Sequence, residues 1–306
     1  MEFYIQAASA ISPKNSLSRE PDYTSLIDPK LIRRMSRIIR MSVAAALSCL
    51  QEAGVSNPDA IVTGTAYGCL ADTGIFLSKV VEQKEEMLPP TAFIQSTHNT
   101  VGGQIALMLH CHGYNNTFVH RGHSFESALL DAMLILREKE DSKVLVGGLD
   151  EITDISQAIL SRFGLYRYAV AGEGAAFFLL TGRKTASTCA RLQGLDTFYK
   201  PKDDAEIEDR IHSFLASLML RPEDIDLVIM GNNGDIAGDK IYGQLASSPF
   251  NGSAMIRYKD FCGEYPTSGS FALWLAVDAI REGRAERVLI YNHYLGIYHS
   301  LMLVSR

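Results

Sequence analysis

The sequence has no long hydrophobic run and no basic start to its N-terminal segment. Its longest apolar stretches, such as Ala175–Leu180, have the length of a strand. A membrane-spanning helix requires ~18 or more uninterrupted apolar residues, so we expect no membrane span. The segment that begins Met1-Glu2-Phe3 also lacks the long apolar core of a secretory signal. From these absences we expect a cytoplasmic protein.

Cysteine and basic charge are also scarce. The five cysteines are odd in number and form no Cys-x-x-Cys pair: Cys49, Cys69, Cys111, Cys189 and Cys262. This pattern favours reduced thiols over a disulfide framework. Lys and Arg total 29 against 35 Asp and Glu, which gives a net charge of −6. Nucleic-acid binders usually carry a basic excess or stripe, so we expect no nucleic-acid partner. The one arginine cluster, from Arg33 to Arg40, has the spacing of a solvated helix face.

What the sequence does contain is an alternation of strand and helix patterns over 306 residues, which is typical of an α/β fold. In the first half we expect strands at Phe3–Ile11, Asp59–Thr65, Thr117–His120, Lys143–Gly147 and Ala175–Thr181. We expect helices from the N-cap Asp28 to the terminating Gly54, at Val101–Leu109 and at Phe125–Glu138. In the second half we expect helices at Glu206–Leu220 and Phe271–Arg281, with strands at Asp226–Gly231, Arg287–Tyr291 and Ser300–Val304.

The second half runs through steps similar to those of the first. Element order and hydropathy agree together, which indicates a repeat of two βα halves related by a pseudo-twofold axis. The polar stretch Thr181–Thr188 separates them. We therefore predict an N-terminal half over residues 1–184 and a C-terminal half over residues 185–306.

Several segments, in order along the first half, resemble the β-ketoacyl synthases of the thiolase superfamily. They are Asp28–Gly54, Val62–Cys69, His98–Ala106, Val146–Glu151 and Gly172–Ala176. The resemblance implies a thiolase-like α/β fold of two pseudo-symmetric βα halves in αβαβα layers. It also implies a dimer, and acyl chains carried on acyl carrier protein.

Members of that family use a cysteine nucleophile at a helix N-terminus and two histidines. The resemblance places the cysteine at Gly122, the first histidine at Gly231 and the second at Glu264. A glycine-rich loop of the family is replaced by the segment from Asn292 to His299. None of the catalytic side chains is intact. The neighbouring residues that we expect to line the site are His123, Ser124, Lys259 and Cys262.

These changes predict a non-catalytic partner subunit in fatty acid- or polyketide-type acyl-chain elongation. Chain-length factors resemble ketoacyl synthases, lack the cysteine and pair with a catalytic synthase. Similar subunits accompany synthases in aryl-polyene and related pigment pathways. The resemblance implies that the strand before the nucleophile pairs with its twin, and Phe118 and Val119 would otherwise lie on an exposed edge. We expect a homodimer, or a heterodimer with a catalytic ketoacyl synthase.

Other interpretations of the same residues remain open. An active acyltransferase or hydrolase on this scaffold would recruit Ser124, His123 or Glu264. In the hydrolase, Ser124 would be the nucleophile of a G-x-S-x-G-like turn, with His293 or His299 as base; otherwise Ser124 is an N-cap. Glu264 has an ion pair with Lys259 as its alternative, and Cys262 is more typical of a core thiol.

A group of potential metal ligands occurs at His110, Cys111, His112, His120 and His123. Zinc favours such side chains, but their spacing matches no known ligand signature. We assign no metal and no cofactor.

Overall fold

The computed structural model describes residues 2–13 and 20–306. Met1, which belongs to the segment tested for a secretory signal, and residues 14–19 of the predicted first half lie outside the described residues. None of the described helices is both long and apolar enough to cross a bilayer.

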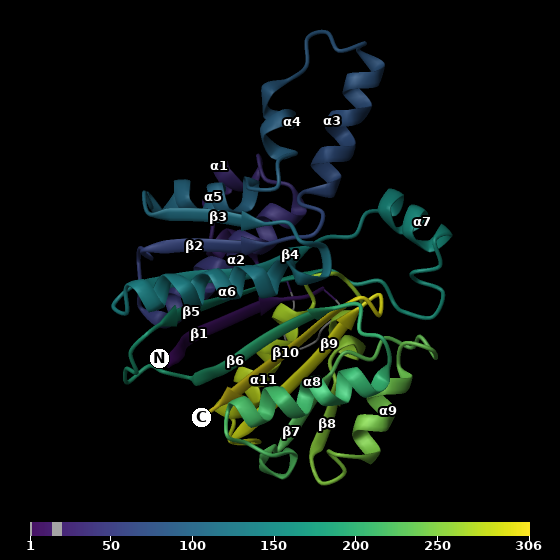
Figure 1. Ribbon diagram of the computed structural model, residues 1–306. Coiled ribbons are helices and arrows are strands. Elements are labelled where there is room, and N and C mark those ends of the chain that lie inside the picture. Colours follow the sequence, from purple (N-terminus) through teal and green to yellow (C-terminus); the bar gives the residue numbers. More distant parts are fainter. Residues whose placement is uncertain (1, 14–19) are drawn as a thin grey trace.

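The described strands form one ten-stranded sheet in the order β3-β2-β4-β5-β1-β6-β10-β9-β7-β8 (Figure 1). The strands of the first half are β1 (Phe3–Ile11), β2 (Ala60–Gly64), β3 (Tyr114–Phe118), β4 (Lys143–Asp150) and β5 (Gly174–Thr181). Those of the second are β6 (Ala190–Tyr199), β7 (Leu227–Met230), β8 (Ala254–Arg257), β9 (Arg287–Tyr294) and β10 (Tyr298–Ser305). Counted from its own outer edge, each half has the same order, with parallel strands at the edge and antiparallel strands at the centre. The predicted repeat of two βα halves is confirmed, and each half contributes five strands.

The two halves join where β1 meets β6, and there only Phe3, Tyr4 and Ile5 are paired across the junction. The helices cover the sheet in layers. They are α2 (Arg37–Ala53), α5 (Thr100–Leu109), α6 (Ser124–Glu138), α8 (Asp204–Ser217), α9 (Lys240–Ser247) and α11 (Gly269–Arg281). Apolar side chains of α6 and α11 share one core with strands of both halves. A second core packs α2 and α5 on the outer face of the first half, and a third packs α8 and α9 on the second. These are the αβαβα layers that the resemblance implies.

A pair of helices and one single helix stand clear of these layers (Figure 1). The helices α3 (Leu70–Glu82) and α4 (Pro90–Gln95) pack against each other and project beyond the sheet; we call residues 70–95 the arm. The helix α7 (Asp154–Arg162) projects separately, at the right of the view. Neither the arm nor α7 was among the predicted elements.

The helix expected from Asp28 to Gly54 is wrong in one respect, because it is interrupted. Asp28 caps the short helix α1 (Pro29–Ile32) by accepting a hydrogen bond from Lys30 N at 2.8 Å. The chain then turns so that Met35 is buried in the core that α2 and α5 form on the first half. Ser36, with an extended backbone, is the N-cap of α2. Gly54 ends α2 in the left-handed conformation, as expected.

The strand expected at Thr117–His120 lies earlier in the chain. β3 pairs in parallel with β2 from Tyr114 to Phe118, and it stops where β2 stops at Gly64. The residues that follow form a 3-10 turn, η2 (Arg121–His123), which leads into α6. The remaining short helices are η1 (Tyr23–Ser25), η3 (Pro222–Asp224) and α10 (Lys259–Cys262).

Candidate functional site

Gly122, the position expected to hold the nucleophile, lies in η2 directly before α6. The β9–β10 hairpin fills the space in front of it. A β-carbon added to Gly122 would lie 2.8 Å from the β-carbons of both Tyr294 and Tyr298. These atoms are fixed to the backbone and cannot swing away, so the position has no room for a cysteine side chain.

Gly231, the position of the first family histidine, follows β7 and faces the same hairpin. A β-carbon there would overlap the Asn292 side chain and would lie 2.8 Å from the Tyr242 hydroxyl. The structure therefore brings Gly122 and Gly231 to one short stretch of β9, Asn292–Tyr294. At both positions that stretch and its neighbours occupy the volume in which a catalytic side chain would lie.

Glu264, the position of the second histidine, is held in a buried ion pair. Lys259 Nζ lies 2.9 Å from Glu264 Oε2, and both side chains are only 2% exposed. The amide Nδ2 of Asn233 donates a second hydrogen bond to the same oxygen at 2.7 Å. Of the two alternatives for Glu264, the structure shows the ion pair.

The Lys259 ammonium also donates to the carbonyl oxygen of His293 at 3.1 Å. Because His293 lies between Asn292 and Tyr294, this bond ties the ion pair to the stretch of β9 that blocks the two glycines. The three positions that the resemblance predicts for the catalytic residues are thus connected through Asn292–Tyr294. A carboxylate held in this way accepts hydrogen bonds and cannot supply the donor of an imidazolium.

Asp150, Tyr67 and Tyr294 complete the site. None of the three was predicted as a site residue from the sequence. Asp150 accepts hydrogen bonds from Thr65 Oγ1 at 2.8 Å, from Tyr67 N at 3.1 Å and, across the two halves, from Thr267 Oγ1 at 2.9 Å. Burial raises the pKa of Asp150 to about 6, although these bonds act in the opposite direction. The hydroxyls of Tyr67 and Tyr294 lie 3.1 Å apart. Asp150 thereby fixes the loop whose Tyr67 contacts the blocking Tyr294.

Ser124 is placed neither as the nucleophile of a hydrolase nor as the N-cap of α6. Its hydroxyl donates to Arg121 O at 2.8 Å and accepts from His120 N at 2.9 Å, and the residue is fully buried. The N-cap prediction is wrong, because His123 occupies the cap position of α6 and Ser124 is its first residue. Ser124 Oγ closes the preceding turn instead.

The histidines near the site are neutral and bonded elsewhere. His293 Nε2 contacts Gly238 O at 2.9 Å, and His299 Nδ1 contacts the Tyr291 hydroxyl at 3.0 Å. Burial lowers the pKa of His293 to about 3 and that of His299 to about 4. His123 contacts His299 O at 3.1 Å, and burial lowers its pKa as well. None of these contacts is to Ser124, so a Ser–His pair is not assembled.

Cys262 is fully buried, and burial raises its pKa well above the ordinary thiol range. It contacts Gly263 O at 3.3 Å and behaves as a core thiol. No group of three or more His, Cys, Asp or Glu side chains within residues 2–13 and 20–306 is arranged to hold a metal ion. Of the potential ligands, His110 ends α5 and His120 contacts Ser127 Oγ at 2.9 Å.

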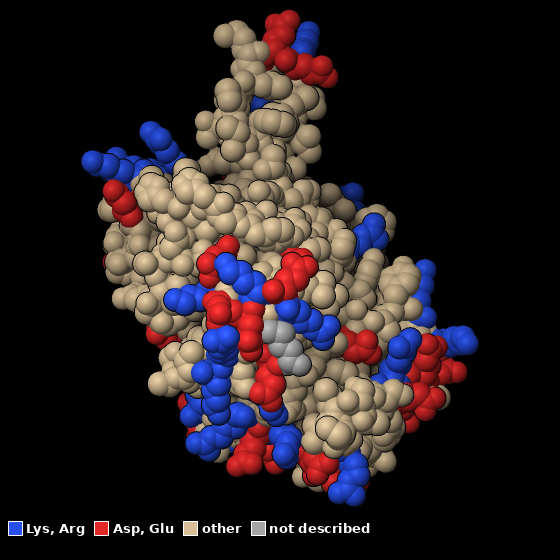
Figure 2. Space-filling view, turned by 60° about the vertical axis from the view of Figure 1, so that its left-hand side comes forward, with Lys and Arg blue, Asp and Glu red and all other residues tan. Residues whose placement is uncertain are grey.

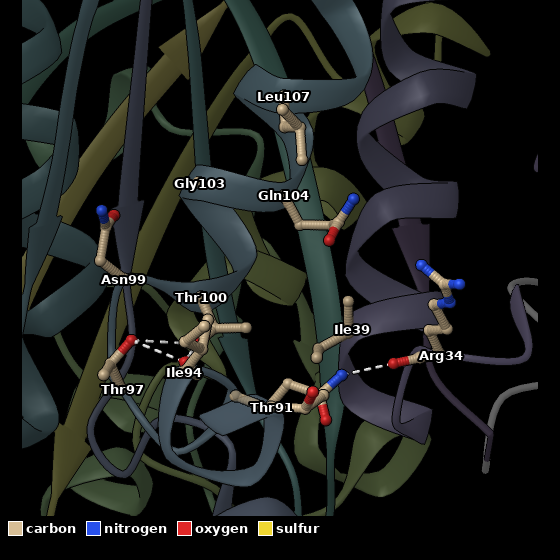
Figure 3. Close-up of a pocket in the computed structure, with 11 residues that line it drawn as sticks. Arg34, Ile39, Thr91, Ile94, Thr97, Asn99, Thr100, Gly103, Gln104 and Leu107 are labelled. Atoms are coloured by element: carbon tan, nitrogen blue, oxygen red, sulfur yellow. Dashed lines mark hydrogen bonds between the residues drawn. The ribbon is translucent and has the colours of Figure 1, made fainter. Parts of the chain in front are cut away.

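Two small pockets flank Asn233. One of about 390 Å³ reaches His293 and Asp235, and one of about 190 Å³ reaches Lys259 and Glu264. A larger pocket of about 830 Å³ lies elsewhere, between the arm, α5 and the start of α2 (Figure 3). Its apolar lining residues are Ile39, Ile94 and Leu107. None of these three pockets is lined by Gly122.

Solved structures with this fold cover almost the whole chain. The ishigamide ketosynthase/chain length factor matches with a TM-score of 0.81 and 15% identity, over 99% of this chain and 98% of that one. A β-ketoacyl synthase from Burkholderia phymatum STM815 matches with 0.78 and 15%, over 100% and 99%. A chain of the AntDE:AntF structure, titled a type II PKS acyl-carrier protein in complex with its ketosynthase, matches with a TM-score of 0.77 and 14% identity, over 99% of each chain. At these identities the matches establish the fold.

A sequence search of curated proteins gives no match. The family model described as "Beta-ketoacyl synthase, N-terminal domain" matches residues 7–183, which is more than half of the chain. Together with the ordered motifs and the two five-stranded halves of equal strand order, this match shows that the chain belongs to the β-ketoacyl synthase family.

Proposed function

We propose that this protein is a non-catalytic partner subunit of a β-ketoacyl synthase and acts, like a chain-length factor, in acyl-chain elongation. The observation that carries the proposal is the lack of space at Gly122 and Gly231. A missing nucleophile alone is compatible with a recruited substitute. Here the hairpin β9–β10 fills the volumes of two catalytic side chains, and the third position is committed to an ion pair.

The comparisons support the role of a partner. One fold match is itself titled a ketosynthase/chain length factor, and another is a ketosynthase in complex with its acyl-carrier protein. By analogy we propose that this chain assembles with a catalytic synthase and meets an acyl carrier protein.

The surface beside β3 suits such an assembly. β3 is an edge strand, and its outer side is unpaired within the described residues. Exposed apolar side chains flank this edge: Leu107 on α5, Tyr114 on β3, Val119, and Leu130 and Leu134 on α6. Exposed edge strands bordered by apolar side chains are sites of strand addition. We propose that this edge pairs with a second copy or with the catalytic synthase.

A basic group in α1 and directly after it suits a carrier with an acidic surface. Lys30, Arg33 and Arg34 are exposed, and none forms an ion pair with another described residue. By contrast, Arg37 nearby is fully engaged, with Glu20 and Glu173. Unpaired charges of one sign steer a partner of opposite sign.

Acyl transfer is the direct test. The protein is incubated with acyl- and malonyl-carrier protein, alone and with the catalytic synthase encoded nearest to it, and intact mass and released CO2 are measured. We expect no acyl adduct and no decarboxylation by the protein alone, and a change in product chain length when it joins the synthase. A stable acyl group on Ser124 or on any cysteine would contradict the proposal.

A further inference from the structure

The root of the arm contains three carboxylates that are almost fully buried. Asp72 lies in the first turn of α3, Glu151 follows β4, and Glu173 precedes β5; they are 7%, 6% and 9% exposed. Glu151 Oε1 accepts a hydrogen bond from Ala71 N at 3.0 Å, which links the body of the protein to the start of α3. Asp72 Oδ2 makes no hydrogen bond of standard geometry with the described residues; burial raises the pKa of this carboxyl, and the Ser36 side chain acts in the opposite direction.

Among the described residues, the one cation that faces this group is Arg37, which is already engaged. Arg37 on α2 pairs with Glu173 and with Glu20, so it neutralises neither Asp72 nor Glu151 directly. The other titratable neighbour is Cys69, before α3, whose pKa is raised by burial and by Asp72 and Glu151. Two carboxylates in one buried site cannot both ionise without a large cost. The positive end of α3 offsets part of that cost.

The arm depends on this root because little else attaches it. α3 packs mainly against α4, and Figure 1 shows both standing clear of the sheet. In Figure 2 the arm is nearly free of charged side chains except at its tip. Its exposed apolar side chains include Ile75, Val81 and Phe93. A change that loosens the start of α3 therefore moves these exposed apolar side chains relative to the sheet.

We propose that Glu151 and Asp72 form a proton-sensitive hinge, in which protonated Glu151 seats the arm on the body and ionised Glu151 releases it. The direction follows from the geometry. Ionisation of Glu151 adds a negative charge to a buried site that already holds Asp72 and in which the described residues supply no free cation. Release of α3 lets water reach both carboxylates and removes the repulsion.

The pH range of the hinge follows from the carboxyl itself. Burial first, then Asp72 and Glu173, raises the pKa of Glu151 to about 7, while the Ala71 hydrogen bond and Arg37 act in the opposite direction. Glu151 therefore holds its proton more tightly when the arm is seated than when the arm is released. Seating is therefore favoured at low pH and weakens as the pH rises through 7. The opening equilibrium constant should increase about tenfold between pH 6 and pH 8.

Hydrogen–deuterium exchange of the full chain tests this. Exchange in Leu70–Glu82 is measured at pH 6, 7 and 8, corrected for the intrinsic pH dependence of amide exchange, with β4 and β5 as internal reports of global folding. In the unmodified protein we expect about tenfold faster opening of α3 at pH 8 than at pH 6. Glu151→Gln keeps the acceptor for Ala71 N and should abolish this difference. Glu82→Gln, the same change at the far end of α3, should retain it.

Equal opening of α3 at all three pH values would overturn the proposal, and so would a full pH response in Glu151→Gln. If Glu151→Gln does not fold, Asp72→Asn takes its place. A reduced response in Asp72→Asn supports the hinge, and an unchanged one contradicts it. Acyl transfer plays no part in these measurements, so the hinge and the proposed function stand or fall separately.

Discussion

Tyr294 on β9 lies against Gly122 so closely that a β-carbon at Gly122 would be 2.8 Å from the Tyr294 β-carbon. The contact joins the end of the second half to the helix start at which the family places its nucleophile. The volume in which the resemblance predicts a cysteine side chain is therefore filled by packing, and a single substitution at Gly122 does not reopen it.

We predict that Gly122→Cys creates no elongation or decarboxylation activity and destabilises the protein by about 1–3 kcal/mol, the usual cost of overpacking. Chemical denaturation and an assay of malonyl decarboxylation measure the two effects. Gly243→Ala is the control, because nothing lies within 4 Å of a β-carbon at Gly243 in α9. That substitution should be neutral or stabilising. Decarboxylation by Gly122→Cys above the unmodified level would show that the matched positions are misplaced.

The buried ion pair gives a second prediction. Lys259→Met leaves Glu264 buried without its cation, and we expect a loss of about 3–5 kcal/mol in the free energy of unfolding. Lys259→Met with Glu264→Leu should lose less than Lys259→Met alone, because no uncompensated charge remains. Asp260→Asn breaks the exposed contact with Arg257 at 3.5 Å and should cost less than about 1 kcal/mol. A Lys259→Met loss as small as that of Asp260→Asn would refute the prediction.

The neutral histidines predict acid sensitivity. The pKa of His299 falls from 6.5 to about 4 on folding, so the unfolded chain binds more protons between these values. His299 thus contributes stability above pH 6.5 that is lost as the pH falls toward 4, at about 1.4 kcal/mol per pH unit. Thermal or urea denaturation from pH 7 to pH 4.5 should show a shallower decline in His299→Gln. The exposed His212→Gln should decline like the unmodified protein; equal slopes for all three proteins would rule out this role.

Association through β3 gives the fourth prediction. We expect the protein made alone to sediment as a dimer at micromolar concentration, and Leu134→Glu on α6 to shift it toward monomer. Met219→Glu alters an apolar side chain that is more exposed than Leu134 but lies far from β3 in sequence, at the end of α8. It should leave the dimer unchanged. A stable monomer of the unmodified protein, or equal effects of both substitutions, would argue against this interface.

The strand–helix alternation and the ordered motifs were sufficient to predict the fold, because buried strands such as Ala60–Gly64 and amphipathic helices such as α2 carry strong periodic signals. The arm and α7 were missed because they do not pack into the layers, and their exposed apolar residues follow no core pattern. β6 was missed because Gly194 and Asp196 interrupt the alternation of apolar and polar residues along it. The division at residue 184 stays a prediction.

For the site, the sequence predicts Gly122, Gly231 and Glu264 as the changed positions, and this assignment stays a prediction. What fills the space beside the two glycines could not be predicted. Tyr294 and Tyr298 belong to a segment recognised only as a replaced loop, and a hairpin that folds back over the site has no local sequence signature. The Lys259–Glu264 pair was one of two alternatives, because five residues of spacing do not fix a contact. Asp150 lay inside a recognised motif, but its bond to Thr267 depends on the docking of the two halves.

The core that α6 and α11 share has a consequence for how the chain unfolds. Strands of both halves bury their inner faces on these two helices, whereas β1 and β6 are paired only at their ends. Neither repeat can cover its inner surface alone, so the pseudo-symmetric units are not independently stable bodies. The chain should melt in a single cooperative transition, and the apparent seam between the repeats should resist proteolysis until the whole molecule opens.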